Sequence, residues 1–301
     1  MIVYVCENDE GKRIDSFIAE LSGISRSKVQ TAVKSEKVFV NGKKIKPSYE
    51  VKENDKIEYE IQDASSIEIQ PENIPLDIVY EDENMAVVNK PSGMLTHPTS
   101  IELEHTLVNA LLYKYGENLS DMNGNFRRGI VHRLDRNTSG LLMIAKNNKT
   151  HEYLADLIKN HNITKKYRAI LKGVYPLDED KIDLPIGRNP NQPNKMTVRE
   201  DGKESLTYLK VLKRYKDATY VELTLITGRT HQIRVHMKHK NHPVFNDTLY
   251  GAGKSGVKTD EQVLQSFYIR FTKPFGSEII ELEIEPDEKI KKVLTYLENR
   301  S

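Results

Sequence analysis

Cysteine and tryptophan are nearly absent from this chain of 301 residues, which holds a single cysteine, Cys6, and no tryptophan. One cysteine excludes a disulfide framework and a cysteine-based zinc site. The longest unbroken apolar run is six residues, 1–6. A membrane-spanning helix needs about 20 apolar residues, and a secretory signal needs a longer apolar stretch behind a charged start. These absences predict a cytoplasmic protein without a membrane partner.

Glycine-rich nucleotide loops are also missing. The chain has no Walker A motif and no GxGxxG motif, so phosphoryl transfer and nicotinamide chemistry both lack a binding element. The string 132–135, HRLD, resembles a kinase catalytic loop, but no DFG triplet exists in the chain. Four histidines lie between residues 231 and 242, yet no cysteine or HEXXH motif accompanies them. We therefore expect no metal site and no cofactor.

Acidic and basic residues nearly balance over the whole chain, whose formal net charge is +1. Two stretches depart from this balance. Residues 25–46 hold seven basic side chains against one acid, and residues 226–242 hold four basic side chains and no acid. Such stripes favour phosphate binding, although a solvated lysine-rich face has the same composition. The candidates in the first stripe are Arg26, Lys28, Lys34, Lys43, Lys44 and Lys46.

The first 62 residues are predicted to form a small α/β module. Apolar side chains at 14, 17, 18 and 21 share one helical face, and Gly23 is placed to end that helix. Ser25 is placed to cap a second helix. A short strand at 38–40 then leads into Asn41-Gly42, a strong hairpin signal.

Residues 63–75 lose all periodicity and contain two prolines, so we expect a linker there. The remaining residues, 76–301, are predicted to form one α+β domain. Their helical and strand patterns do not alternate regularly, which disfavours a doubly wound parallel sheet. Strands are expected at 86–88, 141–145, 167–174, 208–212 and 220–226.

Helix starts in this larger part are predicted from capping residues. We expect a helix at 107–115 behind Thr106 and another at 151–159 behind Thr150. Thr230 is placed to cap a third helix, on which Ile233 and Met237 would face the core.

Two segments have charge patterns that are typical of catalytic or anion-binding sites. Residues 127–140 hold four arginines around one carboxylate, Asp135. An acid among guanidinium groups stays ionised at neutral pH, as a nucleophile or base must, although a structural salt-bridge cluster would have the same pattern. Residues 227–237 run from a strand through a Thr-Gly turn into a helix, with Arg229 and Arg234 at this candidate anion site.

The segment HRLDRNTSGLL closely resembles the central motif of the RluA-type pseudouridine synthases, in the branch that includes RluD-like ribosomal RNA enzymes. Three further segments resemble the other family motifs in the same order, and the first module resembles the alpha-L RNA-binding fold of ribosomal protein S-four. The segments are 132–142 for the central motif, then VVNKPSGMLTHP at 87–98, KKYRAILKG at 165–173 and TGRTHQIRVHMKHKNHPVFNDTLYG at 227–251, with SRSKVQ and VFVNGKKIK in the first module.

This resemblance implies an α+β fold with two parts: an alpha-L RNA-binding domain at 1–62 and a catalytic domain with a mixed or antiparallel sheet at 76–301. It implies an isomerase that converts uridine in RNA to pseudouridine without a cofactor. By matching motifs, Asp135 is the catalytic aspartate, Tyr167 an active-site tyrosine and Arg234 the basic partner of the aspartate. Substrate contacts are implied for Arg133, Arg136, Lys90 and Arg229, and RNA contacts for the basic stripe at 25–46.

The match to the family is not complete. The family usually has GHPIXGD where this chain has 241–247, and often LHA where it has 264–266. The resemblance implies large-subunit (23S) ribosomal RNA as the substrate, with transfer RNA as the alternative. A non-catalytic RNA-binding or ribosome-assembly factor and an RNA hydrolase using His132 are the competing hypotheses. The chemical role of Asp135 stays open between attack on the sugar, attack on the base and removal of a sugar proton.

Overall fold

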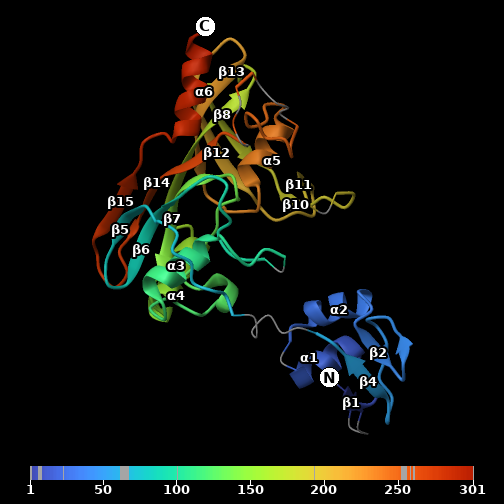
Figure 1. Cartoon of the computed structure of the whole chain (residues 1–301). Coiled ribbons are helices and arrows are strands. Elements are labelled where there is room, and N and C mark those ends of the chain that lie inside the picture. The colour runs from blue at the N-terminus through green and yellow to red at the C-terminus, as the bar shows by residue number, and fades with distance from the viewer. Residues whose placement is uncertain are drawn as a thin grey trace. The chain divides into compact units, whose positions relative to one another are not determined.

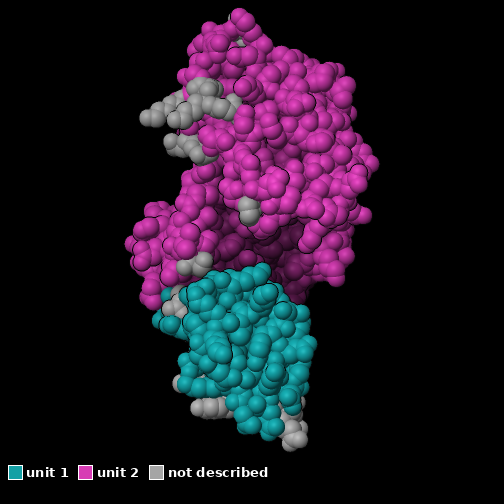
Figure 2. Space-filling model, turned by 90° about the vertical axis from the view of Figure 1, so that its right-hand side faces the viewer, with its two compact units in different colours: residues 1–68 teal, residues 69–301 magenta. Residues whose placement is uncertain are grey.

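The structure is a computed structural model of the chain that describes residues 2–5, 9–22, 24–61, 68–99, 101–192, 194–251, 256–257, 259 and 262–300, without the side chains of Ile2 and Tyr4. The chain divides into two compact units, residues 1–68 and 69–301 (Figure 2). This division lies inside the segment expected as a linker, 63–75. Residues 63–67 of that segment and the helix-ending Gly23 lie outside the described residues.

The first unit packs two helices on a small antiparallel sheet (Figure 1). Its core contains Ile14, Phe17 and Ile18 of the first helix, as their spacing predicts, whereas Leu21 of the same predicted face is exposed. Asn41 and Gly42 adopt φ angles of 51° and 73°, which the hairpin turn requires. The strands pair in the order β1-β4-β2-β3, and the elements are β1 Ile2–Tyr4, α1 Ile14–Ser22, α2 Arg26–Lys34, β2 Val38–Val40, β3 Lys43–Lys44 and β4 Lys56–Tyr59.

A mixed, mostly antiparallel sheet forms the centre of the second unit. Among the described residues nine strands belong to it, with the order β5-β6-β7-β14-β8-β13-β12-β9 and β15 paired to β14. A separate pair, β10 with β11, stands apart from this sheet. The strands are β5 Ile78–Glu81, β6 Met85–Lys90, β7 Ser139–Ala145, β8 Thr164–Lys172, β9 Glu179–Asp183, β10 Ile186–Arg188, β11 Met196–Val198, β12 Leu206–Arg214, β13 Ala218–Leu225, β14 Leu264–Thr272 and β15 Ile279–Glu283.

Helices cover both faces of the large sheet (Figure 1). α4 packs through Leu154 against β6, β7, β14 and β15, and α5 bonds to β12 through His236 and Thr207. α6 covers the opposite face, where Ile290 and Val293 pack on Ile170 of β8. The helices are α3 Leu107–Tyr115, α4 Asn148–Lys159, α5 Gln232–His239 and α6 Glu288–Glu298, with a 3₁₀ turn, η3, at Asn125–Arg127.

Two of the predicted helix starts are wrong. α4 begins at Asn148, because the Asn147 side chain accepts a hydrogen bond from Thr150 N at 2.9 Å and so caps the helix three residues earlier than expected. α5 is preceded by His231, in a left-handed conformation with φ 57°, and not by Thr230. The helix behind Thr106 has its predicted bounds. All five predicted strands form, with ends that differ by a few residues.

The two halves of the large sheet meet at one parallel pair, β7 with β14. Only Ser139 and Gly140 of β7 pair there, with Gln265 and Ser266 of β14. Gly140 has φ +115°, and a Cβ atom on it would collide with the Ser266 backbone, so no larger residue fits. On its other side Ser266 pairs with Tyr167 of β8. Gly140, Ser266 and Tyr167 therefore form one row across three strands.

Candidate active site

A cavity of about 480 Å³ is lined by Tyr167, the β8 member of this row. The segment 131–135, which precedes β7, forms one wall. The start of β8 forms the floor, and the turn 227–229 with the first residues of α5 forms the opposite wall. The cavity therefore collects side chains from both halves of the sheet. Asp135, Tyr167 and Arg234, more than 30 residues apart in sequence, all line it.

Arg234 joins two carboxylates. Its Nη1 donates to Asp135 Oδ2 at 3.0 Å, while Nε and Nη2 donate to the two oxygens of Asp247 at 2.7 and 3.0 Å. Asp247 is fully buried, and it also accepts from Tyr250 N at 3.1 Å. Burial alone would lower the pKa of Arg234, but the hydrogen bonds and charges of Asp247 and then of Asp135 raise it well above its usual range. The guanidinium is thus a fixed cation that aims one N–H at Asp135.

A histidine faces the second oxygen of Asp135. His231 Nε2 lies 3.8 Å from Asp135 Oδ1, and its Nδ1 lies 2.8 Å from the Tyr250 hydroxyl. That hydroxyl oxygen accepts from Met196 N at 2.9 Å, which leaves the Tyr250 O–H free to donate to His231 Nδ1. His231 thus lies between the Tyr250 hydroxyl and Asp135. Burial lowers the pKa of His231, which favours the neutral ring at pH 7.

Tyr167 is an un-ionised phenol in the cavity floor. Its side chain is 7% exposed, and burial raises its pKa to about 12. A phenol with this pKa is not a base at neutral pH, so the ring offers a flat apolar face and a neutral hydroxyl. The negative charge of Asp135 also acts to raise the pKa of the Tyr167 hydroxyl.

His132 is held as a structural acceptor, three residues before Asp135 in the sequence. Its Nε2 accepts a hydrogen bond from Met143 N at 3.0 Å, which ties the segment 131–135 to β7. Burial, followed by the charge of Lys165, lowers the pKa of His132 to about 3. A group that stays unprotonated at neutral pH cannot serve as a general acid, which argues against the RNA hydrolase hypothesis.

Cations dominate the lining of the cavity. Asp135 is the only carboxylate among the lining residues that the structure describes, and it is bonded to Arg234. The lining cations are Arg133, Lys159, Lys165, Arg229 and Arg234. The excess of positive charge suits a polyanion such as RNA. No group of three or more possible metal ligands occurs in the part of the chain that the structure describes.

Two residues expected to contact substrate do not line this cavity. Lys90 is fully buried, and its Nζ donates to the carbonyl oxygens of Pro91, Met94 and Arg136 at 2.7, 2.8 and 3.1 Å. Its three N–H groups are therefore used in holding the loop after Asp135. Arg136 forms a surface ion pair with Glu102. Arg133 and Arg229 do line the cavity, as expected.

The basic stripe of the first unit lies on its surface. Arg26 pairs with the buried Asp15 at 3.4 Å, and Lys44 pairs with Glu36. The other candidate residues of the stripe are exposed and form no ion pair within the described part of the chain; they are Lys28, Lys34, Lys43 and Lys46. These four ammonium groups are available to phosphates.

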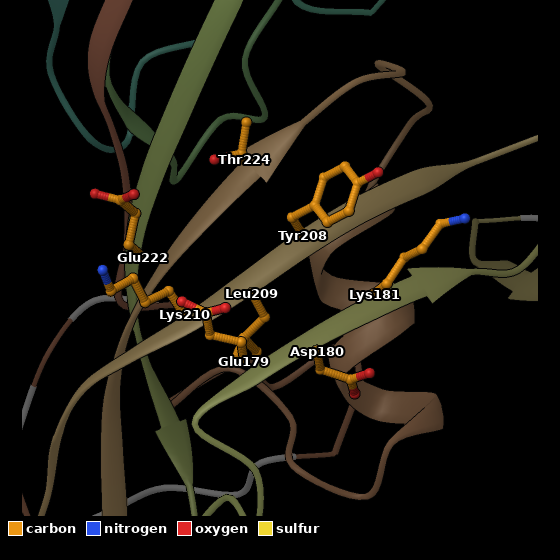
Figure 3. A pocket seen from close by; sticks show the side chains of 8 residues that line it. All are labelled: Glu179, Asp180, Lys181, Tyr208, Leu209, Lys210, Glu222 and Thr224. Atoms are coloured by element: carbon orange, nitrogen blue, oxygen red, sulfur yellow. The ribbon is translucent and has the colours of Figure 1, made fainter.

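A second hollow lies on the opposite face of the sheet (Figure 3). It is a shallow depression over β9, β12 and β13 that contains Tyr208 and Glu222. Two of its carboxylates are held in ion pairs: Glu222 bonds to Lys166 at 3.1 Å, and Asp180 bonds to Lys240 at 2.8 Å. We therefore assign the chemistry to the first cavity.

The roles of four residues in the cavity and its surroundings were not expected from the sequence: Lys165, His231, Asp247 and Tyr250. Three of these lie in the segment 227–251, and Asp247 keeps the aspartate that ends the family pattern GHPIXGD, although other residues of 241–247 depart from it. Lys165 lies two residues before Tyr167, so period-2 alternation along the strand would have placed both side chains on one face.

The chain is similar to several RNA pseudouridine synthases. The family model for RNA pseudouridylate synthase matches residues 84–239, and that for the S4 domain matches residues 12–57. An uncharacterized RNA pseudouridine synthase, YlyB, of Bacillus subtilis (strain 168) is 40% identical, covering 97% of this chain and 96% of that one.

Two further relatives extend this similarity. The protein named ribosomal large subunit pseudouridine synthase D of Buchnera aphidicola subsp. Schizaphis graminum (strain Sg) is 36% identical over 95% of this chain and 94% of its own. The solved structure titled human RNA pseudouridylate synthase domain containing 1 superposes with a TM-score of 0.59 at 28% identity, covering 74% of this chain and 95% of that one. This chain therefore belongs to the RNA pseudouridylate synthase family and is an RNA-modifying isomerase with an S4 domain.

Proposed function

We propose that Asp135, Tyr167 and Arg234 carry the isomerisation and that the substrate is large-subunit ribosomal RNA. The observation that carries the catalytic assignment is the Arg234 guanidinium, which bonds Asp135 at 3.0 Å inside a cavity lined with cations. The relatives named ribosomal large subunit pseudouridine synthase D, 34–37% identical over most of this chain, support the substrate.

The reaction rearranges one nucleoside without an external reagent. The N1–C1′ bond of uridine breaks, the uracil turns, and a C5–C1′ bond forms; the proton on C5 leaves and N1 gains one, so substrate and product are isomers. Bond cleavage builds positive charge on the sugar, as in glycoside cleavage. Asp135 supplies the negative charge at that point, and Arg234 holds one of its oxygens through a hydrogen bond, while His231 lies 3.8 Å from the other.

The target base must leave its stack to reach Asp135. Arg133 is exposed and lines the cavity, and we assign it to the extrusion of the base. Tyr167 then offers its ring to the extruded uracil and its hydroxyl to the edge that carries C5. Arg229 binds backbone phosphate at the rim. Lys90, with its ammonium group bonded to three carbonyls, is reassigned from substrate contact to support of the catalytic loop.

The S4 domain adds affinity without reading sequence. Its exposed lysines contact RNA phosphates, and folded RNA is recognised mainly by shape and backbone. A ribosomal RNA substrate places this activity in the cytoplasm, during ribosome biogenesis. No helix in the described ranges is long and apolar enough to cross a membrane.

A pseudouridine map of total RNA from cells with and without this gene tests both the reaction and the substrate. Carbodiimide labelling and reverse-transcription stops report each pseudouridine. We expect one or a few stops in large-subunit ribosomal RNA to vanish with the gene. Loss of stops in transfer RNA instead would contradict the substrate assignment.

The catalytic assignment is tested with purified protein on the RNA so identified. Asp135→Asn should abolish product formation and leave RNA affinity within a few-fold, because asparagine has nearly the same shape as aspartate and Arg234 keeps its bonds to Asp247. Turnover of this variant at the wild-type rate would refute the role of Asp135. Wild-type protein that binds this RNA but forms no product would favour a non-catalytic binding factor.

A further inference from the structure

Lys165 is a buried cation without a partner in the part of the chain that the structure describes. It lies on β8, lines the catalytic cavity, and is only 7% exposed. Within the described residues its ammonium group has no hydrogen bond and no ion pair, and burial alone accounts for its lowered pKa. Lys90 shows the contrast, since its equally buried ammonium group donates to three carbonyl oxygens. The fold supplies hydrogen-bond acceptors to the ammonium group of Lys90, but among the described residues it supplies none to that of Lys165.

A buried charge that the fold leaves unmatched destabilises the protein. Desolvation of an ammonium group costs several kcal/mol unless an opposite charge or several acceptors compensate. A methionine of similar length would fill the same space without that cost. A group of opposite charge that arrives from outside would remove this cost.

The surroundings of Lys165 identify that group as an anion of the substrate. Asp135, the only carboxylate in the described lining, is bonded to Arg234. His132, whose pKa is lowered by burial and by the charge of Lys165, is neutral. Gly228 borders the ammonium group, and a Cβ atom there would lie 3.5 Å from Nζ, so the glycine leaves this approach open. In the bound RNA the anionic groups are the phosphates, whereas uracil carries neutral carbonyls until the N1–C1′ bond breaks.

Lys165 and Tyr167 project from the same face of β8, two residues or roughly 7 Å apart along the strand. A base seated on Tyr167 therefore places its own backbone near Lys165. We propose that Lys165 binds a phosphate adjacent to the target uridine and thereby sets how deep the extruded nucleotide enters the cavity. This assignment rests on the proposed catalytic roles of Asp135 and Tyr167.

The test uses the full chain and a synthetic RNA that contains the uridine found by the pseudouridine map. Two further RNAs carry a neutral methylphosphonate in place of the phosphate on the 5′ or 3′ side of that uridine. Lys165→Met removes the charge, and Lys165→Arg restores it. Lys166→Met is the matched control, because Lys166 is the next residue on the opposite face of β8 and pairs with Glu222 at 3.1 Å.

We expect Lys165→Met to weaken RNA binding about tenfold or more and to lower the salt slope of binding by about 0.7 to 0.9, the contribution of one phosphate contact. One of the two methylphosphonate RNAs should bind protein with Lys165 intact as weakly as the normal RNA binds Lys165→Met. The same methylphosphonate RNA should bind Lys165→Met no more weakly than the normal RNA does. Lys165→Arg should recover most of the affinity, and Lys166→Met should bind like wild type.

Thermal unfolding separates this role from a structural one. Lys165→Met should unfold at the same temperature as wild type or higher, because an unmatched buried charge has been removed. Two results would overturn the proposal. One is a lower unfolding temperature of Lys165→Met. The other is that both methylphosphonate RNAs bind Lys165→Met more weakly than the normal RNA does, by the same factor. Affinities are measured in the Asp135→Asn background, so the RNA is not converted during the titration. Product formation by Asp135→Asn would refute the catalytic assignment, whereas equal affinity with and without Lys165→Met would refute only the role of Lys165.

Discussion

Replacement of Asp247 by asparagine tests whether the position of the catalytic carboxylate depends on a residue that does not touch the substrate. Asp247 is fully buried and accepts two hydrogen bonds from Arg234, at 2.7 and 3.0 Å. Asparagine has the same shape, but its single carbonyl oxygen can satisfy only one of these donors. Its amide NH₂ then faces the other N–H group of the guanidinium.

The expected loss of stability depends on which hydrogen bonds Arg234 keeps after the substitution. Removal of one partner of a buried ion pair costs about 3 to 5 kcal/mol. Arg234 keeps its bond to Asp135, so we expect the lower end, a loss of about 3 kcal/mol in the free energy of unfolding. The guanidinium is then free to turn away from Asp135. Loss of an outer support of this kind lowers activity about 10- to 100-fold, and we expect the loss in kcat rather than in RNA affinity.

The assay is single-turnover pseudouridine formation at a temperature where the variant is fully folded, with a urea unfolding curve for each protein. Asp180→Asn is the matched control: Asp180 is 11% exposed, pairs with Lys240 at 2.8 Å and accepts from the Tyr175 hydroxyl at 2.5 Å, but does not line the catalytic cavity. It should lose stability with unchanged kcat. Wild-type kcat in Asp247→Asn would refute the argument that Asp247 orients Arg234.

Two further predictions concern acid stability and RNA affinity. His132 has a pKa of about 3 in the folded chain, against an ordinary value near 6.5, so wild-type stability should fall as pH drops from 6.5 toward 3, when only the unfolded chain takes up this proton. In His132→Gln that part of the fall, as much as about 4 kcal/mol, should be missing from urea unfolding curves across this pH range; an unchanged pH slope would contradict the buried neutral imidazole. Joint replacement of Lys28, Lys43 and Lys46 by glutamine should lower the salt slope of RNA binding by about 2 to 3, as measured by fluorescence anisotropy. An unchanged slope would exclude these lysines from the RNA contact.

Much of the fold could be predicted from local pattern. The spacing of apolar residues places the first helix and about half of the strands, and Asn41-Gly42 predicts the hairpin turn that forms. The strands β5, β9, β10, β11, β14 and β15 were not predicted. The first residue of each helix was harder to predict, because several nearby polar residues can cap a helix N-terminus. Thr150 and Asn147 both stand before an apolar run, and only the hydrogen bond from Thr150 N to Asn147 decides between them.

The candidate site could be predicted in part. The motif residues Asp135 and Arg234 do meet, although they are far apart in the sequence. Lys90 could not be assigned, because a lysine in a motif gives no sign of whether its ammonium group faces solvent or three carbonyls. Asp247 was missed for a similar reason: its importance comes from Arg234, which only the tertiary fold brings beside it.

The parallel pair of β7 with β14 also affects how mechanical strain reaches the site. Asp135 precedes β7 and belongs to one half of the sheet, whereas Tyr167 and Arg234 belong to the other half. In the sheet the halves are joined through just two pairs of residues, at Ser139 and Gly140. A small rotation of one half against the other would change the distance between Asp135 and Arg234. Because Asp135 and Arg234 come from different halves, we expect RNA contacts on either half to affect the alignment of these two groups.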